Sequence, residues 1–430
     1  MSDRPASDFG AYVRAGRDAD RLVVQPRMGF GDPALMRSGL AATRGAAART
    51  VGTITIDAHT RVGQLAAVES ALRDGVPLNG YPVVSHPAAT TAAVLAGIRG
   101  PDFPVQVRHG SADPLDIFRA MLAVRLGATE GGPVSYCLPY GRTPLAESVA
   151  NWARGCELLT RLRDSGVEPH LETFGGCMLG QLCPPSQLVA ISVLEALFFA
   201  QHGIRSISVS YAQQTHPGQD REAVAALRRL CGELLPVPDW HVVIYTYMGL
   251  YPETHDGAFR LLGQAAELAV EGGAQRLIVK TAAESRRIPS IEMNVQALEY
   301  AARSARQAPH KPVDAGADSA TYDEAAALVG AVLDLAPDVG RALLLAFRRG
   351  FLDIPYCLHP DNRGRTLSYI DEDGRLCWES TGALPLDAPR RLHSRRVTSA
   401  GLLADLSYVR RKFDTTHRAR QDTESDQTVG

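Results

Sequence analysis

Arginine and carboxylate side chains stand where chemistry on a small acidic molecule would need them. Arg27, Arg61 and Arg108 each lie at or soon after the end of a short apolar segment, and Glu130 stands close to a fourth such segment. One guanidinium group can grip a carboxylate with two parallel hydrogen bonds. Three converging arginines would therefore bind a small molecule with more than one carboxylate. The alternative is that these arginines form ordinary surface ion pairs in an arginine-rich protein.

Lysine is so rare in this chain that its position carries information. Of the 45 basic residues only Lys280, Lys311 and Lys412 are lysines, and Lys280 ends an apolar segment with Glu284 four residues later. A lysine at such a position predicts a binding role for its amine. The alternative is a buried structural ion pair between Lys280 and Glu284.

The segments that must position these side chains alternate between β-branched and helical patterns. Strand followed by helix, repeated about eight times, is typical of a parallel α/β fold, and eight units favour a closed (β/α)8 TIM barrel over a doubly wound open sheet. A further β-like segment at 81–84 is predicted to be a loop because Asn79-Gly80 and Pro87 flank it. The predicted strands are 21–26, 53–57, 105–108, 134–136, 170–174, 206–211, 241–247 and 276–280. The predicted helices include 114–126, 145–164, 186–202, 220–234 and 258–271. In a barrel the loops after the strands meet at one face, which would bring the arginines together.

Composition argues against several other classes of protein. Of the 430 residues 45% are hydrophobic and 21% charged, and a net charge of −2 gives no reason to expect nucleic acid or an anionic membrane as a partner. The longest apolar run, 188–200, contains Glu195 and is too short to cross a bilayer. The first residues lack the apolar core of a signal peptide, so a cytoplasmic location is expected.

A series of motifs follows these segments in a fixed order. They are Val24-Gln-Pro-Arg-Met-Gly29, Thr55-Ile-Asp-Ala-His-Thr-Arg61, Leu78-Asn-Gly-Tyr-Pro82, Val107-Arg-His-Gly110, Glu130-Gly-Gly-Pro-Val-Ser-Tyr-Cys-Leu-Pro-Tyr140, Met248-Gly-Leu-Tyr-Pro252 and Val279-Lys-Thr-Ala-Ala-Glu284. From about residue 20 to about residue 390, the chain resembles the large (epsilon) subunit of glutamate mutase, also called methylaspartate mutase. The resemblance implies a TIM-barrel isomerase that interconverts L-glutamate and (2S,3S)-3-methylaspartate with adenosylcobalamin (coenzyme B12).

The resemblance also implies a set of residues that would contact the substrate. The arginines would hold its two carboxylates, and Glu130 would receive its ammonium group and act as the catalytic general base. This agrees with charge, because glutamate carries two carboxylates and one ammonium group. The implied substrate-binding residues are Arg27, Arg61, Arg108, His109, Glu130, Tyr136 and Tyr140.

A second implied set would contact the adenosyl group of the cofactor. Lys280 and Glu284 would reach its ribose hydroxyls, and we expect them to contact the cofactor only, just as Arg27, Arg108 and Glu130 would contact the amino acid only. The implied cofactor-binding residues are Gly29, Asn79, Pro139, Tyr251, Lys280, Glu284 and Ile288.

The fragment Asp57-Ala-His59 raises the question of a metal ligand. Cobalamin-dependent mutases place a histidine under the cobalt with the motif Asp-x-His-x-x-Gly, but here Gly63 comes one residue too late. The corresponding motif of the glutamate mutase family reads Asp-Ala-Tyr-Thr-Arg. We therefore expect His59 to replace a tyrosine, Arg61 to be the functional residue, and no residue of this chain to bind metal.

The resemblance implies a separate partner and a larger assembly. A small cobalamin-binding subunit carrying the complete Asp-x-His-x-x-Gly motif would supply the axial histidine. A homodimer of large subunits would lie within a heterotetramer. Within this chain we expect an N-terminal segment at 1–20 and the barrel at 21–290. A mainly helical extension is expected at 291–413, with a short β-rich piece near 367–378, and a disordered tail at 414–430.

Some segments depart from the family pattern. The family's His-Gln-Trp-Met is Tyr245-Thr-Tyr-Met248 here, and its Gly-Tyr-Gly is Ser210-Tyr-Ala212. These changes leave the substrate set whole but alter segments that would face the cofactor or the partner. Two other functions stay open: a non-catalytic or altered-substrate homologue that binds an acidic amino acid, and a cofactor-independent barrel lyase that acts on a dicarboxylate.

Overall fold

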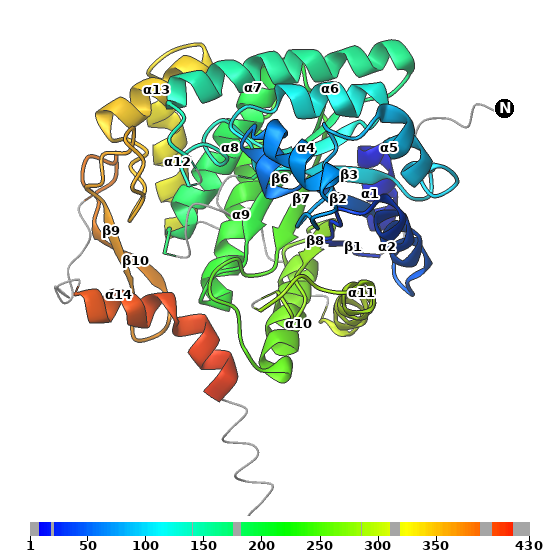
Figure 1. Cartoon of the computed structure of the whole chain (residues 1–430). Helices are drawn as coiled ribbons and strands as arrows, with labels where there is room; N and C mark the ends of the chain where they lie inside the picture. Colours follow the sequence, from blue (N-terminus) through cyan, green and yellow to red (C-terminus); the bar gives the residue numbers. More distant parts are fainter. Residues whose placement is uncertain are drawn as a thin grey trace, which may run out of the picture.

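Short buried segments produce eight parallel strands that form the central sheet of the molecule (Figure 1). The computed structural model describes residues 8–18, 21–139, 141–174, 182–284, 286–309, 319–387 and 398–415. Within these ranges the strands of the sheet are β1 (Val23–Pro26), β2 (Gly52–Thr55), β3 (Val105–Arg108), β4 (Ala128–Gly131), β5 (His170–Thr173), β6 (Ser206–Ala212), β7 (Asp239–Tyr245) and β8 (Arg276–Val279).

The sheet almost closes on itself. Its strand order is β1-β8-β7-β6-β5-β4-β3-β2, so β1 and β2 stand at its two edges. These edges approach each other: Val24 forms a parallel bridge with Thr50, and the Thr55 amide donates to the Met28 carbonyl at 2.9 Å. The predicted TIM barrel is confirmed, and the segment at 81–84 is a loop in which only Tyr81 bridges to Ile56.

One predicted strand is wrong. Residues 134–136 form turns, in which the Tyr136 amide donates to the Gly132 carbonyl at 3.2 Å and the Leu138 amide to the Val134 carbonyl at 3.1 Å. The true fourth strand is β4, which pairs with β5 from Ala128 to Gly131. Val134 and Tyr136 are nevertheless buried in the main core, so their burial does not require a strand.

Helices follow the strands and surround the barrel. They are α2 (Pro33–Gly45), α3 (Ala58–Arg61), α4 (Leu65–Arg73), α5 (Ala88–Leu95), α6 (Leu115–Ala123), α7 (Leu145–Thr160), α8 (Pro185–Gln201), α9 (Pro217–Leu234), α10 (His255–Glu271) and α11 (Ile291–Gln307). The predicted helix at 145–164 ends as a short 3-10 turn, Arg161–Ser165. Helix α11 packs on β1, β8, α2 and α10.

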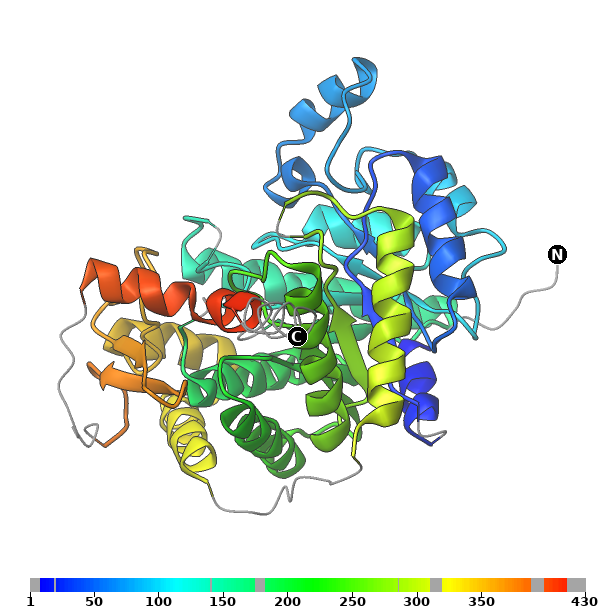
Figure 2. The same cartoon turned by 90° about the horizontal axis from the view of Figure 1, so that it is seen from below.

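A C-terminal extension covers one side of the barrel (Figure 1 and Figure 2). Its elements are α12 (Ala320–Leu333), α13 (Val339–Arg349), the antiparallel pair β9 (Leu367–Ile370) and β10 (Leu376–Ser380), and α14 (Ser399–Leu406). The β-rich piece expected near 367–378 is therefore present. Asp414 and Thr415 are helical, whereas 416–430, the rest of the tail expected to be disordered, lie outside the described residues.

The long apolar helix α8 is buried nearly all round because the extension covers its outer side. It packs on β5 and β6 of the barrel and on α9, α12 and α13. A helix with apolar residues on every side is expected in such a position. No helix in the described ranges is long and apolar enough to cross a membrane.

The inside of the barrel is polar at its centre and is covered at its amino end by α1 (Phe9–Asp18). The Phe9 ring lies 4.8 Å from the His170 ring, measured between centroids. Further up the barrel, polar side chains from β1, β3, β5, β6 and β8 meet in its interior. They are all fully buried: Gln25, Gln106, Glu172, Ser208 and Arg276. The carboxyl ends of the strands lie at the opposite end of the barrel, where loops carry most of the implied site residues.

Candidate active site

Arg108 and Glu130 form a buried ion pair at the carboxyl ends of neighbouring strands. Arg108 ends β3 and Glu130 lies in β4, and the parallel register places their side chains beside each other. Arg108 Nη2 is 2.9 Å from Glu130 Oε2, with side-chain exposures of 4% and 2%. Tyr136 donates its hydroxyl to the other oxygen of Glu130, and Tyr245 donates to Glu130 Oε2 at 2.9 Å. The structure therefore brings together three residues of the implied substrate set.

The protonation of Glu130 is set by opposing effects. Burial raises the pKa of Glu130 above its ordinary value, while Arg108 lowers it and the nearby Glu172 raises it. Burial alone would lower the pKa of Arg108, but Glu130 and Tyr245 raise it overall, so the guanidinium stays charged. Arg108 Nη1 is buried and has no hydrogen-bond partner among the described residues. A carboxylate placed there would supply that partner.

His109 is a neutral, buried neighbour of this pair. Burial lowers its pKa to about 3. Its Nδ1 accepts a hydrogen bond from the Ser111 amide at 3.1 Å, and its ring stacks on Trp152 at 5.6 Å between centroids. Because Nδ1 is an acceptor, the proton of the neutral ring belongs on Nε2. In the described part of the chain, Nε2 is buried and forms no hydrogen bond of full geometry, although the Glu130 backbone carbonyl acts on it as a weak acceptor. Its proton could therefore turn to a ligand.

Sequence reasoning missed a second buried layer directly below Glu130. Glu172 of β5 and Arg276 of β8 form an ion pair in which neither side chain is exposed. Tyr245 donates its single hydroxyl proton between Glu172 and Glu130. Burial would raise the pKa of Glu172, but Arg276 and then Arg108 hold it below its ordinary value. A charged residue inside a buried strand was the available signal, because such a residue must face an interior partner.

Arg61 reaches this region from a short helix. Asp57 begins α3 by accepting from the amides of His59 and Thr60, each at 2.9 Å, and Arg61 is its last residue. A side chain at Gly110, where φ is +75°, would come within 2.9 Å of Arg61 Cδ. Arg61 therefore lies against the loop that follows Arg108 and His109.

His59 points elsewhere. Its ring is exposed and its Nδ1 lies 3.0 Å from Gln64 Oε1, while the Asp57 carboxylate caps the helix instead of orienting the ring. Among the described residues no cluster of His, Cys, Asp and Glu side chains could hold a metal ion.

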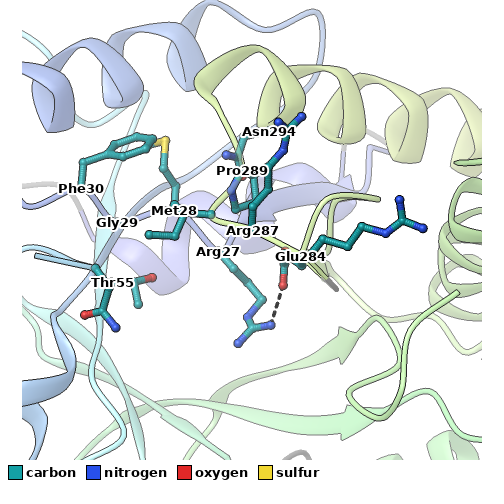
Figure 3. A pocket seen from close by; sticks show the side chains of 12 residues that line it. Arg27, Met28, Gly29, Phe30, Thr55, Glu284, Arg287, Pro289 and Asn294 are labelled. Atoms are coloured by element: carbon teal, nitrogen blue, oxygen red, sulfur yellow. Dashed lines mark hydrogen bonds and ion pairs between the residues drawn. The ribbon is translucent and has the colours of Figure 1, made fainter. Parts of the chain in front are cut away.

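A cavity of about 430 Å³ lies between the loops that follow β1 and β8 (Figure 3). Arg27 Nη1 is 2.8 Å from Glu284 Oε2 across it, with side-chain exposures of 28% and 13%. The implied cofactor residues Gly29, Asn79, Glu284 and Ile288 all line this cavity. Gly29 is required there for close packing, because a Cβ would lie 2.2 Å from the Thr55 carbonyl oxygen. The volume of the cavity is within the range of pockets that bind small molecules.

Lys280 does not line this cavity, but Glu284 and Arg27, which do, are close enough for their charges to act on its amine. Its Nζ is 4.4 Å from the centre of the Tyr251 ring and donates to the Tyr247 carbonyl at 3.4 Å. Burial lowers the pKa of Lys280 to about 8, against the raising effect of Glu284. Pro139 stands in the turn that follows Tyr136, and Tyr140 lies outside the described residues.

The two implied sets meet in the structure. The sequence predicts separate contacts for Arg27 and Glu284, but the ion pair joins them directly. Glu284 therefore pairs with an arginine of the substrate set, and the Lys280 amine bonds to a backbone carbonyl.

These observations define a class of protein: a TIM barrel with buried arginine–carboxylate chemistry at the carboxyl ends of its strands. Residues 5–404 match the family model described as methylaspartate mutase E chain, and the chain belongs to this family. It is 29% identical over 349 residues to the glutamate mutase epsilon subunit of Escherichia coli, with 77% of this chain and 72% of that protein covered. The epsilon subunit of Halobacterium salinarum is 31% identical over 358 residues, covering 80% of this chain and 74% of that protein. That of Haloarcula marismortui is 30% identical over 360 residues, covering 80% and 72%.

Proposed function

We propose that this chain is the catalytic large subunit of an adenosylcobalamin-dependent glutamate mutase. It would interconvert L-glutamate and (2S,3S)-3-methylaspartate. Membership of the family supports an isomerase, and the observation that carries the substrate assignment is the buried Arg108–Glu130 pair with its unpartnered Arg108 Nη1. A buried cation and a buried carboxylate side by side suit an amino acid that brings a carboxylate and an ammonium group.

Substrate binding would exchange internal ion pairs for pairs with the amino acid. A substrate carboxylate would take the free nitrogen of Arg108, with the Nε2 proton of His109 beside it. The ammonium group would take Glu130, which Tyr136 and Tyr245 hold in place. Arg27 and Arg61 would hold the second carboxylate, and Tyr140 is proposed to donate to a carboxylate oxygen. Fixed carboxylates keep the reacting carbon atoms in position.

Glu130 is the proposed general base. Its pKa is raised while that of the neighbouring Glu172 is lowered, so the two carboxylates have different tasks. Glu172 stays ionised against Arg276, whereas Glu130 can accept a proton from the substrate ammonium group. Burial of the whole cluster excludes water from these charges, which strengthens their interactions.

The residues around the cavity fit the adenosyl group. Glu284 offers a carboxylate to ribose hydroxyls and lines the cavity together with Gly29, Asn79 and Ile288. Lys280 would offer an amine of lowered pKa from beside Glu284. Tyr251 and Pro139 would complete the set. When bound, adenosylcobalamin supplies the radical chemistry that rearranges the carbon skeleton. We propose that a small subunit with Asp-x-His-x-x-Gly binds most of the cofactor, within a heterotetramer built on a dimer of large subunits in the cytoplasm.

Two neighbouring substitutions test the site. Arg61→Lys keeps the charge but removes the planar fork of the guanidinium. We therefore expect kcat/KM for L-glutamate to fall about 30-fold, which corresponds to a loss of about 2 kcal/mol in transition-state stabilisation. The exposed His59→Tyr serves as the matched control and should stay near wild type. Both would be measured with the complex reconstituted with the small subunit. A larger loss from His59→Tyr than from Arg61→Lys would overturn this assignment.

A further inference from the structure

A C-terminal helical segment, residues 408–415, lies on the loop between β7 and α10. The Asp414 carboxylate accepts hydrogen bonds from the amides of Glu253 and Thr254, at 3.1 and 3.0 Å. It also accepts from the Thr254 hydroxyl at 2.7 Å, and that hydroxyl in turn caps α10 at the Gly257 amide. One carboxylate thus fixes both the end of the loop and the start of the helix.

An apolar contact reinforces this attachment. Val409 and Phe413 are buried in one cluster with Tyr247 and Tyr251 of the loop and with Ala258 and Leu261 of α10. Arg260 donates to the Phe413 carbonyl, and Arg410 Nη1 lies 3.1 Å from Glu253 Oε1. Polar and apolar contacts therefore act on the same loop from the same short segment.

The same loop between β7 and α10 contacts the Lys280 amine through two of its residues. The Tyr251 ring lies 4.4 Å from Nζ, and the Tyr247 carbonyl accepts from Nζ at 3.4 Å. Lys280 is only 7% exposed, although it directly follows β8. Both loop residues that contact the amine also belong to the cluster formed with Val409 and Phe413.

We propose that residues 408–415 form a clamp that positions the 246–254 loop and so fixes the Lys280 amine against Tyr251, with Asp414 as the main positioning residue. The family match ends at residue 404, so the clamp lies beyond the matched part of the chain. Its consequence for cofactor binding rests on the proposed function. Its effect on Lys280 does not.

The charge of Lys280 reports on the clamp. Burial lowers the pKa of the amine to about 8, Glu284 raises it and Arg27 lowers it further. The other groups against the amine are the Tyr251 ring and the Tyr247 carbonyl. If the loop were released, water would reach the amine, and the desolvation that depresses the pKa would be lost.

The chain has only three lysines, which makes the test direct. The isolated chain would be labelled with 13C at lysine Cε and titrated by NMR, with the Lys280 signal identified from Lys280→Arg. In the wild type we expect a midpoint near pH 8. In Asp414→Asn it should rise by about one pH unit or more, toward the ordinary lysine value of 10.5. Phe413→Leu, which shortens the apolar contact, should shift it in the same direction.

Arg411→Gln is the matched control from the same segment, because Arg411 is exposed and its side chain donates to the Ala404 carbonyl of α14. It should leave the midpoint unchanged. An unchanged midpoint in both Asp414→Asn and Phe413→Leu would overturn the clamp, and so would an equal shift in Arg411→Gln. Because this titration uses neither cofactor nor substrate, its failure would leave the proposed mutase activity untouched. Absence of turnover would likewise leave the clamp untouched.

Discussion

The Arg27–Glu284 ion pair predicts that Glu284, a residue of the proposed cofactor site, weakens the binding of L-glutamate. Glu284 pairs with the Arg27 guanidinium, which is proposed to bind a carboxylate of the substrate. L-Glutamate must therefore displace Glu284 from Arg27. Glu284→Gln removes the competing charge and should tighten L-glutamate binding. A buried charged hydrogen bond contributes about 1.5–3 kcal/mol and an exposed ion pair about 0.2–1 kcal/mol. With side-chain exposures of 28% and 13% the pair lies between these cases. We therefore expect the substitution to improve the binding free energy of L-glutamate by about 1 kcal/mol, which lowers Kd about fivefold.

The assay is calorimetric titration of the isolated chain with L-glutamate. Glu253→Gln removes the same charge from an exposed position in a nearby loop and controls for a general electrostatic effect. In an Arg27→Met background, Glu284→Gln should give no tightening, because the competition no longer exists. Unchanged or weaker binding in Glu284→Gln would refute the reasoning and would favour two independent sites, as the sequence alone predicts.

Three further substitutions test other parts of the structure. Arg276→Met leaves Glu172 buried without its cation and should lower the free energy of unfolding by about 3–5 kcal/mol in urea; a loss below about 1 kcal/mol would contradict the buried pair. Gly110→Ala strains a backbone with φ of +75° and displaces Arg61, so calorimetry should show a larger loss in glutamate affinity than urea unfolding shows in stability. The reverse order would contradict this contact. The pKa of Lys280 falls from an ordinary 10.5 to about 8 on folding, so the folded state carries a full penalty below pH 8 that disappears above pH 10.5. Any stability that Lys280→Met gains over the wild type at pH 7 should therefore shrink at pH 10, and an equal difference at both pH values would contradict the burial of the amine.

The sequence predicts strand ends well where a buried β-branched segment stops at a charged residue. Arg108 ends β3 and Lys280 directly follows β8 for this reason. It fails at β4, because Ala128–Gly131 contains one β-branched residue and lies between glycines, while the more apolar 134–136 looks like the strand. That turn is held by Glu195 of α8, which accepts from the amides of Val134 and Ser135 at 3.0 and 2.9 Å.

The other site contacts could not be predicted from residue spacing in the sequence, because they join segments that are far apart along the chain. Arg27 and Glu284 are 257 residues apart, and their pairing depends on how two loops lie across the barrel mouth. The role of Tyr245 depends on two carboxylates from different strands that face the same interior point. The clamp residue Asp414 falls in a tail whose polar composition predicts disorder.

The most direct test of the central claim is turnover of L-glutamate by the reconstituted complex. The purified chain would be mixed with adenosylcobalamin and a small cobalamin-binding subunit that carries Asp-x-His-x-x-Gly, and the products followed by NMR. We predict that 3-methylaspartate forms only when all components are present, and that Arg108→Met abolishes its formation. Product from the chain without the small subunit would contradict the account, as would no product under conditions in which the same small subunit activates an epsilon subunit of the family.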